Sequence, residues 1–276
     1  MTTIIEPVSL ELVERLNRDL VKASTHLGRD EARYMVDSYY DLQEYRKASA
    51  NRERAASADA EPHELISWLT VQTATLEKQI QRALGAWAAD QPAGAWAQSI
   101  TGIGPVISAG LLAHIDIRQA PTAGHIWRFA GLDPTVTWGK GEKRPWNASL
   151  KRLCWLIGES FVKVQAHEND YYGKLYIERR AKEDKRNERG DFAEQAAAIL
   201  ERKNIGKDTE AYKAYAAGKL PPAHIYQRSK RWTVKLFLSH YHHVAYEVEF
   251  GGPPSLPYIL TQEGGHAHYL APPNWP

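Results

Sequence analysis

The sequence is poor in the residues on which several classes of protein depend. It has one cysteine, Cys154, among 276 residues, which excludes a disulfide framework or a cysteine-based zinc finger within one chain and favours a reducing compartment. No apolar run approaches the ~18–20 residues that a membrane-spanning helix needs. The opening MTTIIEPVSLELVERL also lacks the basic and apolar regions of a secretory signal. We therefore expect a cytoplasmic protein without a membrane partner.

Charge is close to balance overall but is unevenly distributed. The formal net charge is +2, yet residues 1–64 hold nine basic and thirteen acidic side chains, whereas residues 172–235 hold sixteen basic and nine acidic ones. A shorter stretch, residues 140–152, has five basic residues and one acidic residue. Such segregation favours contact with a polyanion through the middle and later parts of the chain. The alternative is a basic face that is merely solvated.

Hydrophobic periodicity predicts a mainly α protein. Apolar side chains recur at three- and four-residue steps over residues 30–45 and again over residues 63–87. We expect two helices joined by a loop over residues 49–62, so that residues 1–90 form a helical hairpin or half of a coiled-coil homodimer. Residues 167–250 are predicted to be a basic helical region that ends in a long helix from about residue 224. Residues 251–276, rich in proline and glycine, are predicted to be an extended tail.

Residues 91–166 carry the most informative pattern, a predicted helix-hairpin-helix. Gly102 and Gly104 allow a tight turn, Ile103 between them points inward, and Pro105 suits the first turn of the next helix. Free main-chain amides at such a turn and helix start attract a phosphate without reading sequence. The alternative is a hairpin that only reverses the chain.

A glycine-rich basic loop, TVTWGKGEKRP, follows the hairpin, and Asn147 is predicted to cap the next helix. Trp138 and Trp146 flank the loop and are candidates for stacking on unpaired bases, with core packing as the alternative. The residues that we expect to contact nucleic acid are Gly102, Ile103, Gly104, Lys140, Lys143, Arg144, Lys151, Arg152, Arg228, Lys230, Arg231 and Lys235.

The order of these parts resembles a known family over about residues 62–165. A long helix leads to ITGIGPVISAGLLAHI, then FAGLDP, the basic loop and NASLKRL. This succession resembles the C-terminal domain of bacterial insertion-sequence transposases of the DEDD-plus-serine class, which are relatives of the pilin-gene-inverting recombinases. The resemblance implies a mobile-element protein of the bacterial nucleoid with a role in DNA transposition and recombination, and with DNA or a structured RNA as partner.

The same resemblance implies two catalytic parts. An N-terminal ribonuclease-H-like domain supplies four acidic residues for metal-ion catalysis, and a serine in the loop after the G-L-x-P motif links covalently to DNA. Residues 1–90 show no strand pattern with embedded acids, and no serine occurs between Pro134 and Asn147. The family's serine is expected near Thr137, Trp138 and Gly139, so Thr137 and, beyond the loop, Ser149 are the candidate nucleophiles.

Histidines gather near the end of the chain, where six of the eleven fall between residues 224 and 268. His240 and His243 share a helical face, and His266 and His268 are two residues apart. Imidazoles at such spacing are candidate ligands for a divalent metal, and packing between the tail and the last helix is the alternative.

These observations support three hypotheses. The first is a nucleic-acid-binding protein, the second is an active recombinase whose acidic half comes from elsewhere, and the third is a coiled-coil scaffold or histidine-metal protein. We rank them in that order.

Overall fold

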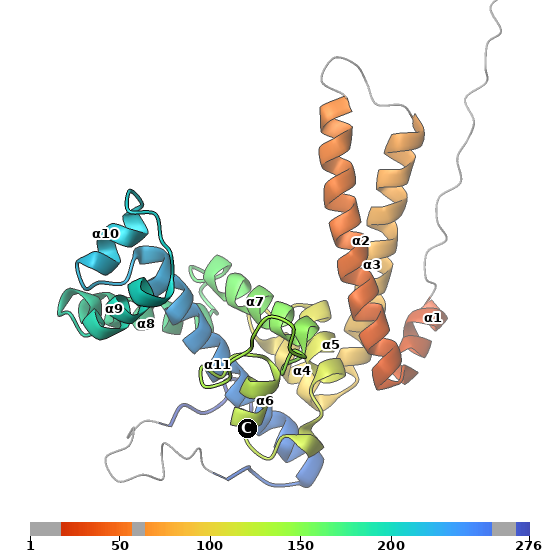
Figure 1. The fold of residues 1–276 in the computed structure, drawn as a ribbon. Coiled ribbons are helices and arrows are strands. Elements are labelled where there is room, and N and C mark those ends of the chain that lie inside the picture. Colours follow the sequence, from red (N-terminus) through yellow and green to blue (C-terminus); the bar gives the residue numbers. More distant parts are fainter. Residues whose placement is uncertain (1–17, 57–63, 256–268) are drawn as a thin grey trace, which may run out of the picture. The chain divides into compact units, whose positions relative to one another are not determined.

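A computed structural model describes residues 18–56, 64–255 and 269–276 of the chain. All regular structure in these ranges is helical and none is β-strand, which confirms the prediction of a mainly α protein (Figure 1). None of the described helices is both long enough and apolar enough to cross a bilayer. The chain divides into two compact units, Met1–Ala95 with Gly104–His114 and Trp96–Ile103 with Ile115–Pro276.

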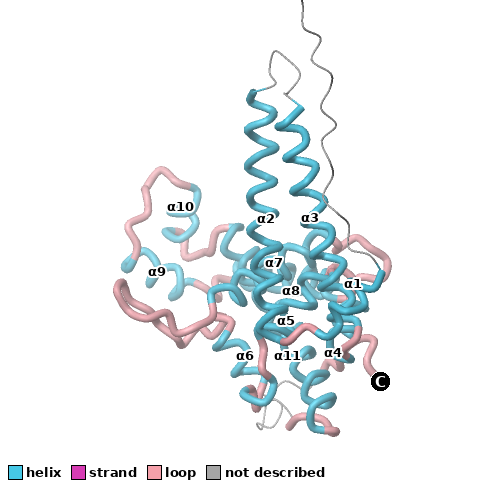
Figure 2. Tube along the Cα trace, turned by 90° about the vertical axis from the view of Figure 1, so that its right-hand side faces the viewer, coloured by secondary structure: helices cyan, strands magenta, loops and turns pink. Residues whose placement is uncertain are grey.

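Unit 1 is built on a pair of long helices. Figures 1 and 2 show α2 and α3 antiparallel and side by side. Its elements are α1 (Arg18–Ala23), η1 (Ser24–His26), α2 (Arg29–Ala56), α3 (Glu64–Ala89), the first half of α4 (Pro92–Ser99) and α5 (Pro105–His114). The predicted helical hairpin is thus confirmed within one chain, whereas dimerisation through it stays a prediction.

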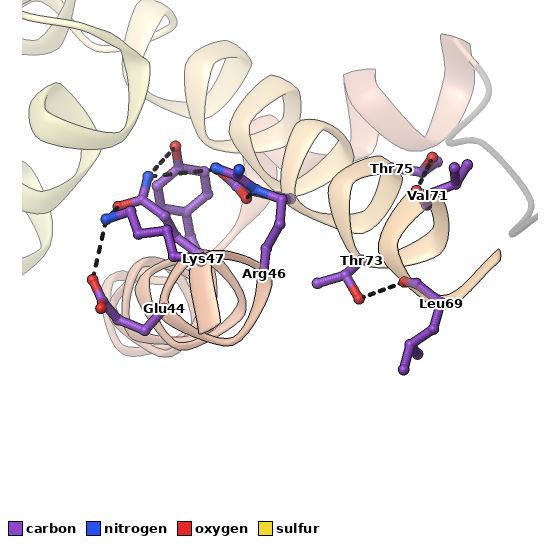
Figure 3. A network of polar contacts seen from close by, with 10 residues as sticks. Glu44, Arg46, Lys47, Leu69, Val71, Thr73 and Thr75 are labelled. Atoms are coloured by element: carbon purple, nitrogen blue, oxygen red, sulfur yellow. Dashed lines mark hydrogen bonds and ion pairs between the residues drawn. The ribbon is translucent and has the colours of Figure 1, made fainter. Parts of the chain in front are cut away.

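The expectation of a loop over residues 49–62 is wrong in its first half, because α2 continues to Ala56. The extension, residues 49–56, includes three alanines, two arginines and one glutamate, which are good helix formers. It is also tied to α3, since the Thr70 hydroxyl donates to the Glu53 carboxylate at 3.0 Å. Further along the pair, Arg46 Nε donates to Glu77 at 2.5 Å. Figure 3 shows Arg46 on α2 and the short-range hydroxyl bonds of Thr73 and Thr75 on α3.

Helix α5 packs against both long helices. The guanidinium groups of Arg29 and Arg33 donate to the carbonyl of Ala113, which is one of the carbonyls that the end of the helix leaves unpaired. The hydroxyl of Ser108, itself buried, donates to the Gly94 carbonyl at 2.9 Å. These bonds satisfy polar groups inside unit 1 that burial would otherwise penalise.

Unit 2 is organised around one long helix, α11, which packs against α6, α7, α8 and η2 (Figure 1). The ring of Phe237 on α11 stacks on Trp96 and meets Phe161 and Tyr172 edge-on in the core. The elements are the second half of α4, η2 (Ile117–Gln119), α6 (Ala123–Phe129), α7 (Ala148–Lys163), α8 (Tyr172–Glu188), α9 (Ala193–Arg202), α10 (Glu210–Ala216) and α11 (Pro222–Phe250). The predicted long helix from about residue 224 is confirmed.

A second, smaller core lies at the start of α11, where Phe192, Ile199, Leu220 and Ile225 pack together. The unit boundaries differ from the predicted divisions at residues 91 and 167. Helix α5 packs with α2 and α3, while residues 115–166 and the basic helical region share one unit.

The last described residues form a strap on unit 2. Trp96 Nε1 donates to the carbonyl of Pro273 at 2.7 Å, and Asn274 Nδ2 donates to the carbonyl of Ser99 at 3.1 Å. The indole of Trp275 donates to Glu247 on α11. Tyr269 also reaches α11, where its hydroxyl contacts His243 Nδ1 at 3.2 Å.

Candidate nucleic-acid interface

The predicted hairpin has the expected local geometry. α4 ends at Ser99, α5 begins at Pro105, and the amide of Ile103 donates to the carbonyl of Ile100 at 2.9 Å. Gly102 has φ +95°, a region that side-chain-bearing residues rarely adopt, and Ile103 is buried as predicted. The turn therefore requires glycine at the first of the two positions.

The two glycines differ in their surroundings. On the unit 2 side, the carbonyl of Gly102 accepts a bond from the Ser160 hydroxyl of α7 at 2.5 Å, and a Cβ at Gly102 would meet Val164 at 3.1 Å. On the unit 1 side, a Cβ at Gly104 would meet nothing within 4 Å. The amides of Val106 and Ile107 in the first turn of α5 have no hydrogen-bond partner among the described residues. The start of α5, rather than Gly102, is thus the part of the turn that has free space and amides without a partner in the described residues.

The basic loop of unit 2 is closed at its base. The amide of Asn147 donates to the Phe129 carbonyl at 2.9 Å, and the Asn147 side chain accepts from the Leu150 amide at 2.8 Å, which confirms the predicted cap of α7. Gly131 has φ +65°, and a Cβ there would approach the Trp146 ring to 2.8 Å. The ring therefore lies directly on the backbone at the start of the loop.

Two carboxylates fold the rest of the loop. Asp133 Oδ1 accepts from the amide and hydroxyl of Thr135 at 2.9 and 2.7 Å, and these bonds hold the Asp133 pKa below its usual value. Glu142 accepts from the Gly139 amide, while its carbonyl accepts from the Trp138 indole, both at 2.8 Å. Asp133 just before the loop and Glu142 within it are thus engaged locally, whereas Lys140, Lys143 and Arg144 are exposed.

Aromatic rings and cations alternate from the loop onto α7. The guanidinium carbon of Arg144 lies 5.3 Å from the centroid of the Trp138 ring, and the Trp138 and Trp146 rings meet edge-on at 5.9 Å. The ammonium of Lys151 lies 4.0 Å from the centroid of the Trp146 ring. Cation–π contacts of this kind hold long basic side chains in place without neutralising their charge.

Four cations are crowded here, and we call Arg144, Lys151, Arg231 and Lys235 the basic face. Partial dehydration and the nearby charges of Arg144 and Arg231 lower the pKa of Lys151. Dehydration and Arg231 likewise lower the pKa of Lys235, although Asp133 opposes the shift. Within the described residues, none of the four forms an ion pair. Crowded cations that form no ion pair gain stability when an anion binds among them.

Other predicted contact residues have partners inside unit 2. Arg228 Nε donates to Glu183 at 2.7 Å, and Lys230, only 3% exposed, pairs with Glu159 of α7. Lys140 and Lys143 are exposed in the loop, and Arg152 is exposed on α7. The structure thus brings part of the predicted set to one face and uses Arg228 and Lys230 within the fold.

The two candidate nucleophiles, Thr137 in the loop and Ser149 in the first turn of α7, are both exposed. A nucleophilic hydroxyl needs an activating base or metal within reach. Among the described residues, neither hydroxyl has a recorded hydrogen bond to a base. Their catalytic role stays a prediction.

The predicted histidine ligands are occupied or lie outside the described ranges. His240 contacts the Tyr172 hydroxyl through Nδ1 at 2.7 Å and the Leu270 carbonyl through Nε2 at 2.8 Å, and burial lowers its pKa to about 4. His243 contacts the Tyr269 hydroxyl at 3.2 Å. His266 and His268 lie outside the described residues. In the described part of the chain, no three His, Cys, Asp or Glu side chains are placed to hold a metal.

One exposed aromatic residue near the basic face was not among the contact residues predicted from the sequence. Trp155 on α7 is 54% exposed, and the Lys230 ammonium lies 5.3 Å from the centroid of its ring. Its position four residues after Lys151, and hence on the same side of the helix, was the available signal.

Comparison with known proteins adds one finding. Residues 95–172 match the model of the transposase IS116/IS110/IS902 family, which is less than a third of the chain. The matched segment contains the hairpin turn, the basic loop and all of α7. Searches of curated proteins and of solved structures found no match.

Proposed function

We propose that this chain acts in DNA transposition and that unit 2 binds the nucleic-acid backbone through the basic face. The observation that carries the proposal is the crowding of Arg144, Lys151, Arg231 and Lys235 without any ion pair in the described residues. The transposase-family segment supports it, because that segment includes the loop and the helix that carry Arg144 and Lys151. DNA is the partner that a transposase segment implies.

Phosphate groups fit the face chemically. Each cation that contacts a phosphate releases counterions, so that the logarithm of affinity falls by about 0.9 per contact for each tenfold rise in salt. The rings of Trp146 and Trp127 hold Lys151 and Lys235 in place, which lowers the entropic cost of ordering these side chains on the backbone. Such contacts position a strand without specifying its sequence.

The test is a titration of the full chain with labelled duplex DNA at several salt concentrations. For the double variant Lys151→Ala/Arg231→Ala, we expect affinity to fall at least roughly tenfold and the salt slope to fall by about two. The double variant Arg189→Ala/Lys213→Ala is the matched control, because it removes the same charge from residues that already pair with Asp191 and Glu210. Equal losses in the two variants, or an unchanged slope, would contradict the proposal.

The start of α5 in unit 1 is a second proposed phosphate contact, since its first amides lack partners and a helix N-terminus attracts anions. Gly104→Val places a side chain where a Cβ meets no neighbour. We therefore expect weaker DNA binding with little change in the free energy of unfolding. Unchanged affinity would exclude the start of α5 as a phosphate contact.

A further inference from the structure

Two tryptophans beside the basic face expose large parts of their rings. Trp138 is 44% exposed and Trp155 is 54% exposed. Exposed aromatic residues occur elsewhere in the chain, for example Tyr34 at 72%, and what distinguishes these two is their place beside the basic face. The phosphate contacts proposed above do not use these rings.

Each exposed ring is held from one side. Arg144 lies over the Trp138 ring, whose edge meets Trp146. Lys230 lies near the Trp155 ring, and its own stem fills the space that Gly158 leaves open, where a Cβ would approach Lys230 Cγ to 2.6 Å. We call the two exposed rings platforms; the Trp155 platform rests on the buried Lys230, whereas the Arg144 beside Trp138 is itself exposed.

The platforms and the basic face form one row. Trp138 meets Trp146, Trp146 lies under Lys151, and Lys151 is one helical turn before Trp155 on α7. Arg231 is close enough to depress the pKa of Lys151. Aromatic rings with cations at their sides are the combination that single strands require, since bases stack on the rings while phosphates follow the charges.

We propose that this row binds unpaired nucleic acid, with bases stacked on Trp155 and Trp138 and phosphates on Lys151 and Arg231. The inference rests on the proposed nucleic-acid binding and narrows it to single-stranded segments. Bases in a duplex are already stacked on one another, so a duplex offers the face only its backbone. Stacking is sequence-tolerant, and the same chemistry serves single-stranded DNA and RNA.

The experiment compares a labelled single-stranded 20-mer of DNA, the RNA of the same sequence and the corresponding DNA duplex, each titrated with the full chain. For Trp155→Ala, we expect single-strand affinity to fall roughly 5- to 100-fold, the range for one lost base stack, and duplex affinity to change less than twofold. Trp155→Phe keeps an aromatic ring and should recover most of the loss. Trp138→Ala should act in the same direction.

Phe250→Ala is the matched control, because Phe250 is a similarly exposed aromatic residue (53%) at the far end of α11 from Lys230. Thermal unfolding of each variant verifies that the fold is kept. Selective loss of single-strand binding in the Trp155 and Trp138 variants supports the inference. Equal loss for the duplex, equal loss in Phe250→Ala or failure of Trp155→Phe to recover binding overturns it.

The two proposals fail in distinguishable ways. If single strand and duplex bind alike, with a steep salt dependence that the Lys151→Ala/Arg231→Ala variant reduces, the backbone interface stands and the stacking inference falls. If none of the three nucleic acids binds, both fall.

Discussion

Two arginine-rich regions of unit 2 look alike in the sequence and differ in the structure. Around α8, Arg179, Arg186 and Arg228 converge on one carboxylate, Glu183, whose side chain is completely buried. At the basic face, Arg144 and Arg231 lie beside Lys151 with no carboxylate paired to them in the described residues. The first region uses its cations to hold helices together, whereas the cations of the second form no ion pair in the described residues and are the proposed phosphate contacts.

Of the variants that test this comparison, we expect the largest loss of stability for a change at Glu183. Glu183→Gln removes the charge that three guanidinium groups share, and breaking a buried ion pair from one side costs about 3–5 kcal/mol in the free energy of unfolding. Urea unfolding measures the loss. Glu178→Gln changes an exposed residue of the same helix that forms no ion pair among the described residues, and it should alter stability by less than about 0.5 kcal/mol. A small effect at Glu183 would mean that its arginines are not structural.

The second-largest effect is a pH-dependent loss of stability at His240, whose hydrogen-bond partners also lie inside the fold. Its pKa of about 4 lies below the unfolded value of 6.5, so the folded state disfavours the proton. The corresponding stability is present above pH 6.5 and is lost as the pH falls toward 4, by about 3 kcal/mol in total.

Urea unfolding between pH 7.5 and 4.5 tests this, and His240→Gln should flatten the profile. The exposed His167 serves as control through His167→Gln, which should leave the slope in place. An unchanged profile in His240→Gln would show that other groups carry the acid sensitivity.

A smaller loss of stability is expected at Gly131, where the backbone at the start of the basic loop meets the Trp146 ring. Gly131→Ala places a Cβ at φ +65° and against the Trp146 ring. We expect a loss of about 1–3 kcal/mol in the free energy of unfolding and weaker DNA binding, because Trp146 supports Lys151. Chemical unfolding measures the loss of stability, and a DNA titration of the same sample measures the loss of affinity. Full DNA affinity in Gly131→Ala would mean that the ring does not position Lys151.

The smallest effect is expected for a cation that is exposed but already paired. Arg189 pairs with Asp191 at 2.9 Å, and a surface ion pair contributes about 0–1 kcal/mol. Arg189→Ala should therefore change stability by less than about 1 kcal/mol and leave duplex affinity nearly unchanged. A large loss of affinity would extend the interface to α8 and remove the distinction between the two regions.

The sequence predicted what depends on local pattern. Periodic apolar residues located the helices, and Asn147 and Pro105 marked two helix starts correctly, because caps and first-turn prolines act within a few residues. Arg179 and Glu183, four residues apart on α8, form an ion pair that is likewise local in the sequence. The contact of Arg228 with Glu183 spans 45 residues and has no local signal.

Burial explains two positions that the sequence did not predict, Lys230 and Trp155. Lys230 was expected at the surface, yet Gly158 on α7 leaves room for its stem, and Glu159 neutralises its charge inside the fold. Trp155 has apolar neighbours in the sequence, yet it is 54% exposed. Neither outcome follows from residue type, since each depends on how α7 meets α11.

The strap of residues 269–276 has a consequence for the order in which unit 2 is assembled. The hydrogen bond between Trp96 and Pro273 joins positions 177 residues apart. Contacts of such high sequence separation form late, after the entropy of closing a long loop has been overcome. During synthesis, Trp96, Ser99 and Glu247 therefore lack these partners until residues 269–276 have been made, and the transposase-like segment stays incomplete until then.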